Sequence, residues 1–63
     1  MSADNYLHVT LDFRVLYGFA SAPGPGREIG QGASLEEAVR IATDYEVECG
    51  HVEYGISFER GSS

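Results

Sequence analysis

Lysine is absent from this chain of 63 residues, and four arginines are its only strongly basic side chains. Ten carboxylates oppose them, which leaves a formal net charge of −6. A surface of this sign repels nucleic acid and anionic lipid, so direct binding to either is disfavoured. It attracts a basic protein surface instead, although acidity also serves solubility alone.

Cysteine is almost as scarce as lysine. Cys49 is the single thiol, so no disulfide can form within the chain, and a lone thiol fits a reducing compartment. No apolar run approaches the roughly 20 residues of a membrane span. The N-terminus also lacks a basic region followed by an apolar core, so a signal peptide is not expected. These absences predict a cytoplasmic protein without a membrane partner.

The length allows one domain, which buries only about 60% of the surface of the unfolded chain. We expect a single domain over residues 1–63. Residues 1–5 and 61–63 show no pattern, and we expect them to be disordered tails.

The longest regular pattern lies between Tyr6 and Phe19, where every odd-numbered residue is apolar. A period of two predicts a strand with one buried face. A strand of this length would span about 46 Å, beyond the ~27 Å breadth of so small a domain. The run must bend, with Gly18 as a site for a bulge, or form a hairpin through residues 12–14. We favour one bent strand, because no Gly, Pro or Asn supports the turn.

A turn and a short strand are predicted next. The Pro and Gly residues of segment 21–26 favour a turn, since Pro fixes φ and Gly accepts positive φ. Arg27–Gln31 is predicted to return as a short edge strand beside the first.

A helix over 34–49 is the clearest local prediction. Ser34 has the character of an N-cap, and Glu37, three residues on, completes a capping box. The helix ends between Asp44 and Cys49, and Gly50 is its predicted left-handed terminator. Its predicted apolar side consists of Leu35, Ala38, Val39, Ile41, Ala42 and Tyr45, joined by Cys49 if the helix continues.

From His51 to Glu59 the period returns to two, which predicts a last strand with Val52, Tyr54, Ile56 and Phe58 buried. The fold class is therefore α+β, in the order strand-strand-helix-strand. We expect a three-stranded antiparallel sheet, or a four-stranded one, with one helix on one face. A parallel last strand would require a right-handed crossover. The opposite face, left to water or a partner, carries His8, Thr10, Asp12, Arg14, His51, Glu53 and Glu59.

No catalytic or metal-binding motif is present, and we expect no catalytic residue, metal or cofactor. His8, Cys49 and His51 are the one candidate ligand set, but structural zinc usually takes four such ligands. A small metal-dependent enzyme built on these three residues is the alternative from another class. The Gly24-Pro25-Gly26 segment does not predict a dinucleotide loop, because the helix begins eight residues later.

Carboxylates gather on the predicted helix. Glu37, Asp44 and Glu48 fall along one exposed stripe, at rises of about 10 Å and then 6 Å. Asp44, Glu46 and Glu48 lie near the helix C-terminus, where each carboxylate costs about 0.3–1 kcal/mol. A solvated helix face is the plain interpretation. A locally unfavourable cluster indicates a role outside folding.

Two segments, Tyr-Gly-Phe-Ala-Ser-Ala-Pro-Gly-Pro-Gly at 17–26 and Gly-Ala-Ser-Leu-Glu-Glu-Ala at 32–38, resemble HicB-like antitoxins. Members of that family share an aromatic strand, a Pro/Gly turn and this type of helix start. The resemblance implies a partial ribonuclease-H-type sheet with one helix and no catalytic residues. It also implies a partner, which is a basic RNA-cleaving toxin.

In size, acidity and lack of catalytic motifs, the whole sequence also resembles small phage-encoded anti-CRISPR proteins. That resemblance implies a protein of the bacterial host cytoplasm which occupies a nucleic-acid site on a CRISPR effector.

We therefore predict a non-enzymatic inhibitor, monomeric or weakly dimeric, that binds a basic protein surface by imitating nucleic acid. A HicB-like antitoxin is the alternative, and assembly of copies through strand edges is a further one. Arg14 and Arg40 would set orientation, and Arg40 is predicted to contact Glu36 and Asp44. The predicted partner-binding residues are Glu36, Glu37, Arg40, Asp44, Glu48 and Glu53.

Overall fold

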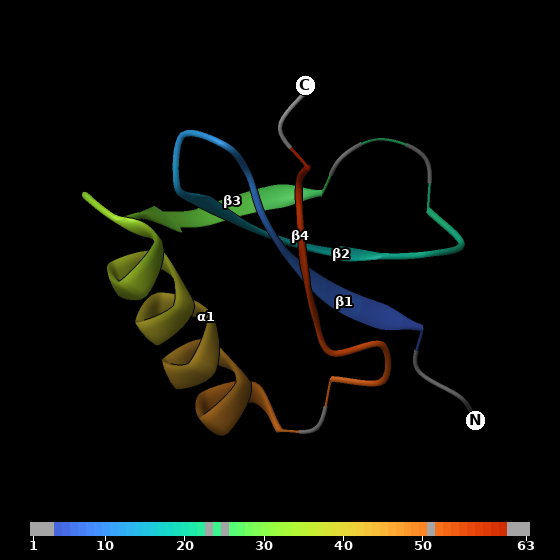
Figure 1. Cartoon of the computed structure of the whole chain (residues 1–63). Coiled ribbons are helices and arrows are strands. Elements are labelled where there is room, and N and C mark those ends of the chain that lie inside the picture. Colours follow the sequence, from blue (N-terminus) through green and yellow to red (C-terminus); the bar gives the residue numbers. More distant parts are fainter. Residues whose placement is uncertain (1–3, 23, 25, 51, 61–63) are drawn as a thin grey trace.

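The computed structural model describes residues 4–22, 24, 26–50 and 52–60. Within these ranges, four strands form one sheet in the order β3-β2-β1-β4, and one helix, α1, lies on one face of it (Figure 1). The α+β class and the one-helix architecture are thus confirmed. The elements are β1 (Asn5–Val9), β2 (Arg14–Phe19), β3 (Arg27–Gln31), α1 (Leu35–Cys49) and β4 (Ile56–Phe58).

The sheet is mixed, which corrects the expectation of a purely antiparallel one. β2 pairs antiparallel with both β1 and β3, whereas β4 pairs parallel with β1. The chain leaves β3 at one edge, passes through α1 and enters β4 at the other edge. A crossover that contains a helix is long enough to return the chain in the same direction, as parallel pairing requires.

β1 and β2 form a hairpin, so the prediction of one bent strand is wrong and its alternative is correct. The Thr10 N–H donates to the Arg14 carbonyl at 2.9 Å, and the Phe13 N–H donates to the Thr10 carbonyl at 3.0 Å. Phe13 adopts a φ of 66°, which costs a non-glycine residue about 1–2 kcal/mol. Asp12 is the turn-favouring residue at this site, since its short side chain bonds to nearby groups.

The core lies between α1 and one face of the sheet. Ala38 and Ala42 of α1 pack on side chains from β1, β2 and the loop before β4, which are Leu7, Val9, Val15 and Val52. The hairpin removes Leu11 from the predicted buried face, because that residue now lies in the turn. Phe19 and Leu35 are exposed at the ends of their elements, and Tyr54 is exposed because residues 52–55 form a turn.

Helix α1 begins at the predicted N-cap, but Glu37 reaches back to Ala33, one residue before the cap, and not to Ser34. The Ser34 hydroxyl accepts a hydrogen bond from the Glu37 N–H at 3.3 Å, and the Glu37 carboxylate accepts one from the Ala33 N–H at 3.2 Å. The helix continues to Cys49, and Gly50, with a φ of 93°, ends it. Cys49 is exposed and does not join the apolar side.

The two ends of the fold differ from the predicted bounds. β4 starts at Ile56, because Gly55, with a φ of 70°, closes a turn onto the Val52 carbonyl. Position 51, predicted to start that strand, lies outside the described residues. The expectation of a loose tail is wrong for Asp4 and Asn5: the Asp4 carbonyl accepts from the Ala20 N–H at 2.8 Å, and Asn5 is buried in β1. The other predicted tail residues, 1–3 and 61–63, are also outside the described ranges.

Candidate protein-binding surface

All six side chains predicted to bind a partner are exposed. Glu36, Glu37, Arg40, Asp44 and Glu48 lie on α1, whereas Glu53 lies in the loop that joins α1 to β4. The structure therefore brings five of the six together on one element and places the sixth beyond its C-terminal end.

The orientation of α1 places three of its carboxylates along one edge of the molecule. Ile41 packs against Gly30 of β3, where an added Cβ would lie 3.1 Å from the Ile41 Cγ2. Glu37, Asp44 and Glu48 are four residues before, three after and seven after Ile41, so helical periodicity places them on the same flank. We call these three residues the acidic row. It follows the side of α1 that faces β3.

Within the described ranges, no arginine forms an ion pair with the acidic row. In the described ranges, both ion pairs within 4.0 Å belong to Arg14, which lies 3.1 Å from Asp12 and 3.7 Å from Glu28. The predicted contacts of Arg40 with Glu36 and Asp44 are not formed. Arg14 alternates along β2 with the buried Val15, so it lies on the face away from α1. The structure does not bring Arg14 together with the acidic row.

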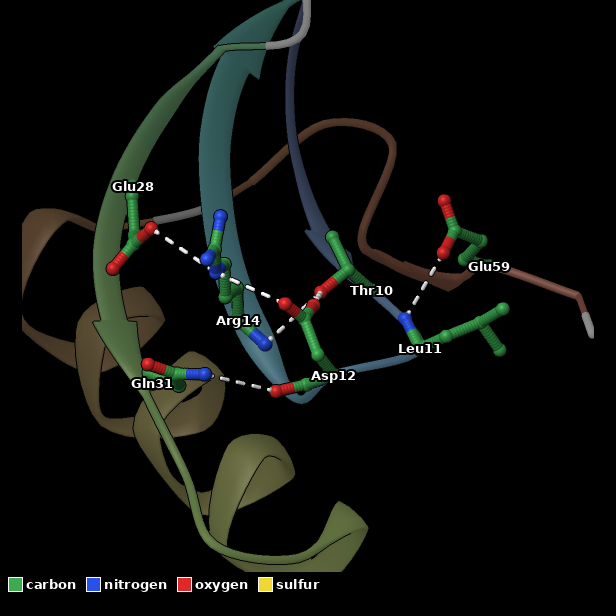
Figure 2. Close-up of polar contacts among 7 residues, drawn as sticks. All are labelled: Thr10, Leu11, Asp12, Arg14, Glu28, Gln31 and Glu59. Atoms are coloured by element: carbon green, nitrogen blue, oxygen red, sulfur yellow. Dashed lines mark hydrogen bonds and ion pairs between the residues drawn. The ribbon is translucent and has the colours of Figure 1, made fainter.

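A polar cluster at the β1–β2 turn was not recognised in the sequence. The Thr10 hydroxyl donates to the Asp12 carboxylate and accepts from the Arg14 N–H at 3.0 Å (Figure 2). The Gln31 amide donates to the Asp12 carbonyl at 3.2 Å, and the Glu59 carboxylate accepts from the Leu11 N–H at 3.0 Å. Two of these bonds lie within residues 10–14, and the other two join the turn to the end of β3 and to the residue after β4. The cluster therefore stabilises the hairpin, and the Thr-x-Asp spacing is the signal that could have revealed it.

Hydrogen bonds of this kind lower the pKa values of two aspartates. The Thr10 hydroxyl bond, opposed by partial desolvation and aided by the Arg14 charge, holds the pKa of Asp12 below 3.8. Hydrogen bonds from Ser21 likewise hold the pKa of Asp4 below 3.8. Since both values are lowered in the folded state, the resulting stabilisation is fully present above pH 3.8. It is lost as the pH falls through the folded pKa values.

Thr10→Val is expected to raise the pKa of Asp12 toward its ordinary value, because the main hydrogen bond to the carboxylate is removed. NMR titration of the side-chain carboxyl carbons measures this shift. Asp4 is the internal control, since its hydrogen bonds come from Ser21, and its midpoint should not change. An unchanged Asp12 midpoint in the variant would show that the hydroxyl does not hold the carboxylate.

The candidate metal ligands do not form a site among the described residues. His8 Nδ1 lies 2.9 Å from the Ser57 hydroxyl on the face away from α1. Cys49 is exposed at the end of α1, and the third candidate, at position 51, is outside the described ranges. No group of three His, Cys, Asp or Glu side chains is arranged to hold a metal ion within those ranges.

Among the hollows that the described residues form, two lie at opposite ends of β2. The larger, about 370 Å³, lies beside the β2–β3 connection, and its lining includes Tyr17, Phe19 and Arg27. The smaller, about 200 Å³, lies at the opposite end of β2, near the hairpin turn. Sequence reasoning missed the second hollow because it placed its rim residues in the core. They are Leu11, Leu35 and Phe58, with Val9, Thr10, Phe13 and Glu59 completing the lining.

No protein-family model matches the chain, and no curated protein or solved structure is significantly similar to it. The resemblances to HicB-like antitoxins and to anti-CRISPR proteins therefore stay predictions. Over the part of the chain that the structure describes, no helix has both the length and the apolar character needed to cross a membrane.

Proposed function

We propose that the protein is a non-enzymatic inhibitor of a nucleic-acid-handling protein. Its proposed target is the nucleic-acid site of a CRISPR effector. The acidic row carries this proposal. It places Glu37, Asp44 and Glu48 on one exposed flank of a single helix, and the described residues include no arginine within 4.0 Å of them. The net charge of −6 adds a negative field around the row.

The backbone of α1 gives the row its geometry. Successive carboxylates are separated by rises of about 10 Å and 6 Å along the helix axis. Basic side chains that normally bind phosphate would meet these carboxylates instead. Such complementarity raises the association rate and the specificity more than it raises affinity. Added salt should weaken binding to the basic partner, since the electrostatic screening length is about 10 Å at 0.1 M ionic strength.

Neutralising the row by Glu37→Gln, Asp44→Asn and Glu48→Gln is expected to reduce the association rate with a purified target effector at least about tenfold at low salt. Surface plasmon resonance at several salt concentrations measures this association rate. Gln at position 37 can still accept a hydrogen bond from the Ala33 N–H, so the helix should persist. The matched control is Asp4→Asn, Glu28→Gln and Glu46→Gln, which changes net charge equally at other sites. Equal losses in both triple variants would show that net charge, not the row, governs binding.

A plaque assay tests the cellular role. The chain is expressed in bacterial strains that each carry one defined CRISPR system and are challenged with a targeted phage. We expect restored plaque formation in at least one strain, and loss of that effect in the acidic-row variant. Restoration of plaques by the acidic-row variant to the same level would contradict the proposed mechanism.

The alternative is a HicB-like antitoxin, and the Gly-Ala-Ser-Leu-Glu-Glu-Ala segment favours it. In the structure this segment forms the capped start of α1, and Glu36 and Glu37 lie in its first turn. Co-expression with a ribonuclease toxin of that family tests this function. Rescue of growth, without any effect on phage plaques, would favour the antitoxin over the CRISPR inhibitor.

A further inference from the structure

Three of the large apolar side chains exposed on this protein meet around one hollow. Leu11 in the hairpin turn, Leu35 at the start of α1 and Phe58 at the end of β4 are each exposed by half or slightly more. They line the hollow of about 200 Å³, together with the buried Val9 and the half-buried Phe13. Clustered apolar exposure of this kind is typical of a binding site, whereas scattered apolar residues are normal.

The arrangement of the elements explains why this surface is uncovered. α1 packs chiefly on β1, β2 and β3, whereas β4 is the far edge of the sheet (Figure 1). Phe58 pairs in register with the buried Val9, so its side chain lies on the α1 side, beyond the area that α1 covers. The hairpin turn then brings Leu11 to the same end of the molecule.

The one charged side chain among the residues that line the hollow is negative. The Glu59 carboxylate lines it and is held there by the Leu11 N–H at 3.0 Å. Glu36 and Glu37 follow Leu35 in the first turn of α1. Arg60 is next to Glu59 in the chain but does not line the hollow. Two copies of a chain with a net charge of −6 repel each other, so a second copy is a poor occupant.

We propose that the hollow receives one large apolar side chain from a segment of the partner that carries arginine or lysine on both sides of it. The volume suits a single side chain, since it is below the 300–1,000 Å³ usual for small-molecule pockets. A buried apolar anchor with a charged surround is a common form of interface hot spot. This inference rests on the proposed function, because it names the contact that fixes the basic partner in position.

Three synthetic peptides test the proposal by NMR titration of the labelled protein. One has basic flanks and a central Leu, one has the same flanks and a central Ser, and one has acidic flanks and a central Leu. The first is expected to bind at least about tenfold more tightly than the other two. Its chemical-shift changes should centre on Leu11, Leu35 and Phe58.

Leu35→Gln is expected to weaken binding of the basic Leu peptide at least about tenfold. Val47→Gln is the matched control, since Val47 is 78% exposed on α1 and does not line the hollow. Circular dichroism verifies that both variants fold.

The outcomes separate this inference from the proposed function. Equal binding of the basic Leu and basic Ser peptides would show that no apolar side chain enters the hollow, but it would not contradict the charge-based function. Equal binding of both Leu peptides would contradict the claim that the bound segment has basic flanks. Absence of binding by both basic peptides would count against both proposals. A dimer that Leu35→Gln abolishes, seen by analytical ultracentrifugation, would assign the hollow to a second copy and overturn the inference.

Discussion

Leu7→Ala is expected to cost about 2–5 kcal/mol of the free energy of unfolding, which is a large share of the stability of this protein. Leu7 is fully buried in the central strand β1, where it packs in the core with Ala38 and Ala42 of α1. A domain of this size has a total stability of about 3–9 kcal/mol. The variant should therefore populate the unfolded state to a measurable extent at room temperature.

Urea unfolding followed by far-ultraviolet circular dichroism measures this loss. Leu16→Ala is the matched control, because Leu16 pairs with His8 on the opposite, uncovered face of the sheet and is only half-buried. Its loss should be less than half as large. Similar midpoints for the two variants would contradict a core that lies only between the sheet and α1.

Gly32→Ala is expected to have the second largest effect, about 1–3 kcal/mol or more. An added Cβ would lie 2.7 Å from the Ala38 backbone nitrogen and 3.1 Å from the Glu37 Cβ, both in the first turn of α1. Gly32 cannot move away easily, since its N–H donates to the Phe13 carbonyl at 2.8 Å. The start of α1 must shift instead. For a domain of 60–100 residues, each lost kcal/mol lowers Tm by about 4–8 °C.

Gly30→Ala is the control for this prediction. Its added Cβ would meet the Ile41 Cγ2 at 3.1 Å, and that side chain can adjust where helix backbone cannot. We expect a much smaller change in Tm, because relief of glycine's unfolded-state entropy offsets part of the crowding. Thermal unfolding by circular dichroism compares the two variants. Equal shifts in Tm would mean that the approach of Gly32 to α1 is not as close as the structure shows.

The elements that depend on near neighbours were predictable from the sequence. The bounds of β3 and the Ser34 cap agree with prediction, because turn residues and hydrogen bonds within one helical turn determine them. The exposure of the acidic row also follows from helical periodicity. The sequence does not determine whether Arg40 forms an ion pair, since exposed ion pairs gain little free energy and restrict the side chains that form them.

Only the tertiary structure decided three features of this protein. They are the β1–β2 hairpin, the parallel pairing of β4, and the exposure of Leu11, Leu35 and Phe58. Period-two alternation gives each strand an inward face, but it does not say where the chain reverses or how far one helix extends across the sheet. One helix of 15 residues packs chiefly on three of the four strands. Phe58 on the remaining strand, and Leu11 and Leu35 around the same hollow, therefore stay in contact with water. The sequence alone thus determines the helix, its cap and the α+β class, while long-range packing determines which apolar residues are left for a partner.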